Sequence, residues 1–122
     1  MSVAVYYEAR RARSLSADEK KAIDKIMEKY SVDDLIRRYV ENGEGFDWES
    51  FELRDALEPG VVLAGATKLP DNTEEAVWIG IQHWSNALGE IRRLLDDAAW
   101  RVSVEDHEIP WDAGKQAYDP SR

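Results

Sequence analysis

The sequence predicts an α+β fold in which two long helices cover one face of a four-stranded antiparallel sheet. Two stretches repeat apolar residues at the spacing of a helix, and four shorter stretches have the apolar pattern of strands. Turn residues separate these stretches. A chain of 122 residues fits one domain. We place this domain at residues 1–112 and expect a polar C-terminal tail at residues 113–122.

The clearest element is a helix over residues 73–95. Its apolar residues recur at steps of three and four and form one stripe, made of Val77, Ile81, Trp84, Leu88, Ile91 and Leu95. Asn72 or Thr73 supplies the N-cap, and the charges at both ends match the helix dipole. Gly80 and Gly89 either let another segment come close or are simple imperfections of the helix. We expect the middle of the stripe to be buried against the sheet.

The N-terminal third predicts one strand and two helices. Residues 2–13 alternate, with Val3, Val5, Tyr7 and Ala9 on one side. A capping box at residues 16–19 begins a helix that extends to residue 30. A second capping pattern at Ser31 begins a short helix that ends near Asn42 and Gly43. We expect this short helix to cover an edge of the sheet.

The next segment, residues 41–58, is acidic, because seven carboxylates are opposed only by Arg54. Within it, residues 48–53 predict a second strand with Phe51 and Leu53 facing inward. Residues 61–68 are apolar on both alternating faces, as a central strand tends to be. Residues 100–105 predict the last strand, which Pro110 ends, and the polar residues after Asp112 predict a loose tail.

This order of elements resembles the split βαβ order of the ferredoxin-like sandwich, up to about Trp111. The resemblance is one of architecture, and no motif matches a functional family. It implies a strand order 4-1-3-2 with both long helices on one face. The other face would then be bare, with Tyr6, Val62, Ala64 and Ala66 on it. We therefore predict a homodimer through this open face, although such small apolar side chains also tolerate water.

Charge and composition exclude several classes of function. The net charge is −9, and residues 41–122 carry eighteen acidic but only seven basic groups. Such a field repels phosphate backbones and anionic lipid, so we expect neither a nucleic-acid nor a membrane partner. The longest apolar run, at residues 61–66, is too short to span a bilayer. The chain has no Cys, and we expect a cytoplasmic protein with no cofactor.

The densest polar cluster, residues 104–112, is the best candidate for chemistry. It contains four carboxylates and His107, one of the two histidines. On a strand these side chains face opposite ways, so they do not converge on one metal ion. A pair of metal ligands on a helix requires a second His or carboxylate three or four residues away, and His83 has none. We therefore predict no metal site and assign no catalytic residue.

Five Trp residues are a high count for this length, and two of them, Trp48 and Trp111, lie in acidic, turn-rich segments. Each is either a core residue or an exposed interface anchor. With these anchors, we predict a binding surface formed by Asp47, Trp48, Glu49, Asp106, Glu108 and Trp111.

The leading hypothesis is a small, acidic, non-catalytic binding or regulatory domain. An immunity-type inhibitor of a basic protein partner would fit the charge. The alternative is a small dimeric ferredoxin-like enzyme that has a pocket between sheet and helices, with His107 or His83 as the base.

Overall fold

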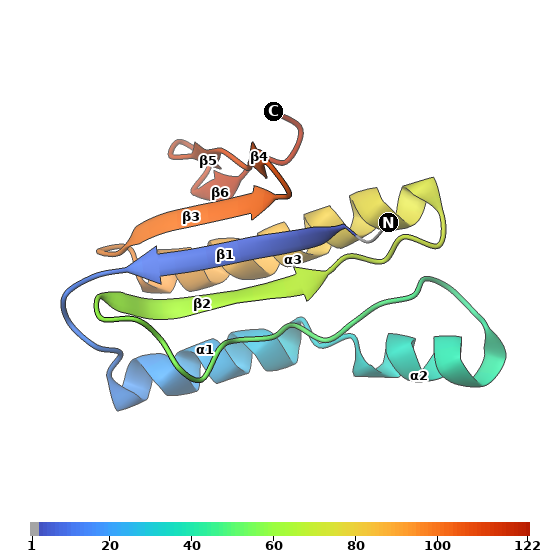
Figure 1. Ribbon diagram of the computed structural model, residues 1–122, viewed down its shortest axis with the longest axis horizontal. Helices are drawn as coiled ribbons and strands as arrows, with labels where there is room; N and C mark the ends of the chain where they lie inside the picture. Colours follow the sequence, from blue (N-terminus) through green and yellow to red (C-terminus); the bar gives the residue numbers. More distant parts are fainter. Residues whose placement is uncertain (1–2) are drawn as a thin grey trace.

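The computed structural model describes residues 3–122 (Figure 1). Its elements in chain order are β1 (Ala4–Arg10), α1 (Ala17–Lys29), α2 (Asp33–Asn42), β2 (Val61–Lys68), α3 (Glu74–Leu94), β3 (Ala99–Val104), β4 (His107–Glu108), β5 (Trp111–Asp112) and β6 (Ala117–Tyr118). The predicted α+β class and the four-stranded antiparallel sheet are confirmed. Within residues 3–122, no helix has the length and apolarity of a membrane-spanning segment.

The sheet has the order β2-β1-β3-β4, and every neighbouring pair is antiparallel. Tyr7 at the centre of β1 pairs with Gly65 on one side and with Val102 on the other. Alternate residues of β1 are buried in the core, namely Val5, Tyr7 and Ala9. The alternation that predicts a half-buried first strand is therefore confirmed.

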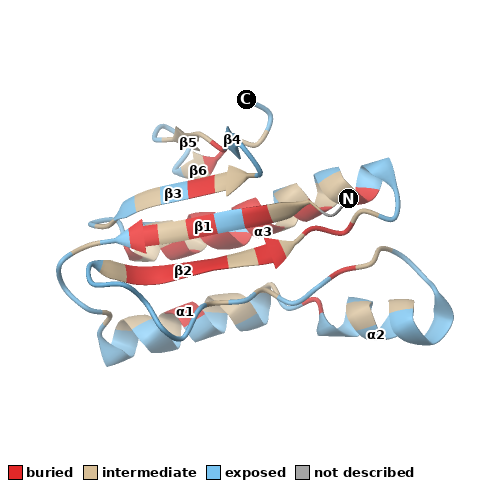
Figure 2. Cartoon of the chain, in the orientation of Figure 1, coloured by how far each residue is buried: buried red, intermediate tan, exposed pale blue. Residues whose placement is uncertain are grey.

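The long helix α3 lies along the buried face of the sheet (Figures 1 and 2). Trp84, Leu88 and Ile91 are all at most 1% exposed, which confirms the predicted orientation of the stripe. Thr73 caps the helix, since its side chain accepts a hydrogen bond from the amide of Ala76. The Ser16–Glu19 capping box of α1 is also present.

The two glycines of α3 have different explanations. A Cβ at Gly80 would lie 2.6 Å from Cδ of Pro70, so this glycine lets the chain before the helix pack closely. A Cβ at Gly89 would have only an ordinary contact, 3.9 Å from the Trp111 ring. Close approach therefore explains Gly80 but not Gly89.

The predicted strand over residues 48–53 is wrong, because this segment forms no strand. Trp48 and Phe51 both contact Trp84, with ring centroids 6.1 and 5.3 Å away. Residues three apart on a strand face opposite sides, so an extended backbone would not bring both rings to Trp84. The full ferredoxin-like strand order is therefore not formed. β2 lies at an edge of the sheet rather than in its middle.

Residues 50–54 are nevertheless fixed against β2. The Tyr7 hydroxyl donates to the carbonyl of Glu52 and lies 2.7 Å from Oγ1 of Thr67. Thr67 Oγ1 also accepts from the Glu52 amide, and the Arg54 amide donates to the carbonyl of Ala64. Burial of the phenol raises the pKa of Tyr7 to about 12, so it stays a donor at neutral pH.

The C-terminal residues are not a loose tail. β5 and β6 form a second, two-stranded sheet, and Tyr118 is buried. Arg92 of α3 stacks over the Trp111 ring, 4.4 Å from its centroid, and donates to the Tyr118 hydroxyl. This packing of two aromatic rings on one arginine holds the hairpin to α3.

Candidate functional site

The acidic residues Asp47 and Glu49 belong to a cluster around Lys68 at the end of β2. The Lys68 ammonium lies 3.6 Å from Asp47, 3.8 Å from Glu49 and 3.5 Å from Asp71. Asp47 Oδ1 also accepts from the amides of Asp71 and Asn72, at 2.7 and 3.1 Å. Partial burial alone would raise the pKa of Asp47, but these hydrogen bonds and Lys68 lower it. Asp47 therefore holds residues 45–49 to the start of α3, while Glu49 remains exposed.

Trp48 is a core residue rather than an exposed anchor. It is 8% exposed and lies edge-on to His83 and Trp84, with centroid distances of 5.1 and 6.1 Å. His83 Nε2 is 2.8 Å from the Tyr30 carbonyl, and because a carbonyl only accepts, Nε2 is the donor. His83 therefore has a structural role between α1, α3 and Trp48.

The second predicted group consists of Asp106, Glu108 and Trp111. Asp106 and Glu108 belong to the β3–β4 hairpin, and Trp111 begins β5. Asp106 and Glu108 are exposed, and Glu108 lies 3.5 Å from Arg101. Trp111 is half-buried against Arg92. β2 and β4 are opposite edges of the sheet, so this group is separated from Asp47 and Glu49 by β1 and β3. The structure does not bring the six predicted residues into one surface.

The histidine of this hairpin, His107, is exposed, and its Nε2 lies 2.8 Å from the carbonyl of Arg122. Within residues 3–122, no group of three or more His, Asp or Glu side chains is arranged to hold a metal ion. The hairpin therefore resembles a solvated strand end more than a reaction centre.

A different surface, on α2, has the composition of a binding site. None of the residues of α2 is buried, and the helix extends beyond the end of the sheet (Figures 1 and 2). Its inner side is attached through buried Val32 and half-buried Ile36. Leu35 and Val40 lie at the two margins of the apolar stripe, about 140° apart at ~100° per residue. They are 40% and 77% exposed.

A groove of about 380 Å³ lies beside the Leu35 margin of α2. Its lining combines three apolar side chains with an arginine and a glutamate, and consists of Leu35, Arg38, Glu44, Gly45, Phe46 and Trp48. We call the groove together with Val40 the α2 surface. Residues 33–58, which contain it, carry nine acidic residues and three arginines, a net charge of −6 out of the chain's −9. The α2 surface is therefore an apolar region within the most acidic part of the chain.

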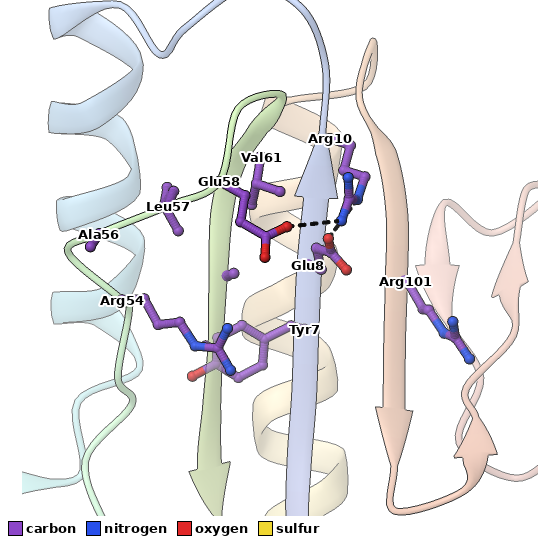
Figure 3. Close-up of a pocket in the computed structure, with 11 residues that line it drawn as sticks. Tyr7, Glu8, Arg10, Arg54, Ala56, Leu57, Glu58, Val61 and Arg101 are labelled. Carbon is purple, nitrogen blue, oxygen red and sulfur yellow. Dashed lines mark hydrogen bonds and ion pairs between the residues drawn. The ribbon is translucent and has the colours of Figure 1, made fainter.

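A second groove, also of about 380 Å³, lies on the open face of the sheet (Figure 3). Arg10, Arg54 and Arg101 line it together with Glu8 and Glu58. Arg10 pairs with both glutamates, at 2.6 and 3.9 Å, as the dashed lines in Figure 3 show. Among residues 3–122, Arg54 is the one arginine of this groove without a carboxylate partner.

The open face is also less apolar than predicted. Val62 and Ala64 are buried within the single chain, and the large exposed apolar side chains of this face among the described residues are Tyr6 and Leu57, the second of which lines the groove. Comparison with protein-family models, with curated proteins and with solved structures finds no match.

The α2 surface was not predicted from the sequence, because the short helix was expected to cover an edge of the sheet. One feature of the sequence would have identified it. With Val40 included, the apolar stripe is wide for a helix of ten residues. Contact on the Ile36 side of this stripe leaves Leu35 and Val40, at its two margins, exposed.

Proposed function

We propose that this protein is a small, non-catalytic binding or regulatory domain that docks a basic protein partner on the α2 surface. The supporting observation is that α2 is amphipathic, has no buried residue and exposes Leu35 beside an apolar groove and Val40 at the opposite margin of its stripe. Exposed apolar surface on a projecting helix is typical of interfaces.

The charge around this surface favours a basic partner. Residues 33–58 carry most of the excess negative charge, and Glu41, Glu44 and Glu49 are exposed there. Carboxylates at the rim of an interface speed encounter with a cationic protein, while apolar side chains at its centre supply the desolvated contact. An inhibitor of a basic protein, of the immunity type, would use both features. No nucleic-acid or membrane partner is expected from this charge.

The alternative, a small dimeric ferredoxin-like enzyme, has less support. Its base would be His83 or His107, and each has a ring nitrogen hydrogen-bonded to a backbone carbonyl. Neither lines the α2 groove or the groove on the open face. We keep the ferredoxin-like fold as a proposal. In it, residues 48–53, which form no strand, take the place of the second strand.

The homodimer through the open face stays a prediction. Tyr6 is an exposed apolar side chain of this face that would anchor it. Light scattering at high micromolar concentration decides between a 14 kDa monomer and a particle of twice that mass.

The proposed docking surface is tested by capture of proteins from a cell lysate with the immobilised chain and three variants. Leu35→Asp and Val40→Asp each place a charge on the α2 surface. Trp78→Asp is the matched control, because Trp78 is also exposed, at 41%, but lies on α3. We expect basic proteins that bind the wild type and Trp78→Asp to lose about tenfold or more in affinity for the α2 variants.

The salt dependence provides a second criterion for the same proteins. Because rim carboxylates act through screened Coulomb forces, binding should weaken when the salt is raised. Equal capture by wild type and Val40→Asp, or capture that is indifferent to salt, contradicts the proposal.

A further inference from the structure

The groove of about 380 Å³ on the open face of the sheet is lined by charges whose sum is opposite in sign to that of the chain. Its lining holds three arginines and two glutamates, whereas the whole chain carries −9. Two of these arginines are already paired. Arg10 lies 2.6 and 3.9 Å from the two glutamates of the lining, and Arg101 lies 3.5 Å from Glu108 of β4. The uncompensated positive charge of the groove therefore lies on Arg54.

The backbone of Arg54 is fixed at the margin of this groove. Its amide donates to the carbonyl of Ala64 at 2.8 Å, which holds the residue beside β2. From there its exposed side chain extends toward β2 and Tyr7, into the groove (Figure 3). Since no carboxylate of residues 3–122 pairs with it, its guanidinium can receive an anion from solution.

The charged groups of the lining determine which anion fits. A guanidinium presents parallel N–H donors that match the two oxygens of a carboxylate. Glu8 and Glu58 also line the groove, and they would repel a second negative charge on the ligand. The ligand should therefore carry a single carboxylate rather than the dianion of a phosphate monoester.

The uncharged groups of the lining favour an apolar body on this carboxylate. Leu57 is 38% exposed and lines the groove together with Ala56, Val61 and Ala64. An apolar group laid against these side chains leaves water, and this burial adds to the affinity of the ion pair.

We propose that the groove on the open face binds a small monocarboxylate with an apolar body, whose carboxylate pairs with Arg54 while its body contacts Leu57. The volume is at the lower end of the range for small-molecule sites. The proposal does not rest on the docking of a protein at the α2 surface, because the two grooves share no lining residue. Tyr6, which would anchor the predicted homodimer, does not line the groove either.

The test is a titration of the isotopically labelled full chain with benzoate, followed by NMR of the Arg54 Nε–H and of the backbone amides. Three probes each change one property of benzoate: benzamide removes the charge, phenyl phosphate adds a second charge, and acetate removes the ring. We expect benzoate to shift the Arg54 Nε–H in a saturable manner, and raised salt to weaken its binding. Benzamide and phenyl phosphate should each bind about tenfold more weakly or worse. Acetate should also bind more weakly than benzoate.

The variants separate the Arg54 ion pair from a general effect of charge. Arg54→Gln should weaken benzoate binding about tenfold or more and should remove the preference for benzoate over benzamide. Its fold should be unchanged, because the side chain is exposed and the bond to Ala64 uses the backbone amide. Lys25→Gln is the matched control, since it removes the same charge from an exposed position on α1 outside the groove. Leu57→Ala should lower the affinity for benzoate but not that for acetate.

The opposite results overturn the proposal. Absence of a saturable shift at millimolar benzoate shows that the groove does not bind this class of ligand. Benzoate binding that persists in Arg54→Gln, or that falls equally in Lys25→Gln, shows that Arg54 does not hold the carboxylate. Equal or tighter binding of benzamide or phenyl phosphate refutes the single negative charge.

Discussion

Replacement of Gly65 by alanine should destabilise the protein strongly, although it adds a single methyl group. An ideal Cβ at residue 65 would lie 2.2 Å from the carbonyl oxygen of Glu52 and 2.8 Å from Cε2 of Tyr7. Neither neighbour can move alone, because the Tyr7 hydroxyl is bonded to that same carbonyl and its ring stacks on Phe51 at 4.5 Å. The added methyl would therefore force residues 50–54 away from β2.

The expected cost follows from two contributions. Overpacking of a buried site costs about 1–3 kcal/mol. Loss of the Tyr7–Glu52 and Arg54–Ala64 hydrogen bonds adds about 0.5–1.5 kcal/mol for each. We therefore expect Gly65→Ala to lower the free energy of unfolding by about 2–6 kcal/mol, a large part of the ~5–15 kcal/mol typical of a domain.

The assay is urea unfolding of the wild type, Gly65→Ala and Gly89→Ala, followed by circular dichroism. Gly89→Ala is the control, because its new Cβ would have only an ordinary contact and the change favours the helix by about 1 kcal/mol. If Gly65→Ala costs less than about 1 kcal/mol on the overpacking scale, residues 50–54 do not lie against β2 and the packing described above is refuted.

Three further outcomes test the core, the acid stability and the α2 surface. Leu88→Ala should cost about 2–5 kcal/mol in the same unfolding assay, and a loss below about 1 kcal/mol would contradict the orientation of α3. The hydrogen bonds from Arg11, together with the Ser16 amide, lower the pKa of Glu19 to about 2 from its ordinary 4.5. The stabilisation from Glu19 is thus complete above about pH 4.5 and is lost as the pH falls toward 2. The unfolding midpoint should depend less steeply on pH in this window for Glu19→Gln, and an unchanged slope would show that Glu19 is not paired. Val40→Asp should change the free energy of unfolding by no more than about 0.5 kcal/mol, because an exposed side chain has little packing to lose; a larger loss would mean that Val40 is covered.

The sequence was sufficient to predict the elements that repeat their pattern over several turns. α3 extends over 21 residues and holds five of the six stripe positions, with the sixth, Leu95, as its C-cap, so its orientation follows from local spacing. The cap residues Ser16 and Thr73 act over three residues of chain, and both caps are formed. β1 alternates over enough residues to fix which side chains enter the core.

Packing between distant residues explains the elements that were not predicted. Residues 48–53 have a strand-like composition, but Trp48 and Phe51 both pack on Trp84, which lies more than thirty residues away in the chain. The C-terminal hairpin is held by Arg92, whose contacts with Trp111 and Tyr118 have no local pattern. The structural contacts of Asp47 and the burial of Trp48 also depend on distant residues, which the local sequence does not reveal.

The most direct test of the proposed function is amide hydrogen exchange of the chain, alone and bound to a captured basic partner. α2 has no buried residue, so its amides should exchange rapidly in the free protein. If the partner docks on the α2 surface, it should slow exchange in residues 33–49 and leave the β3–β4 hairpin unchanged. Protection at the hairpin or on the open face of the sheet, with α2 unaffected, would contradict it.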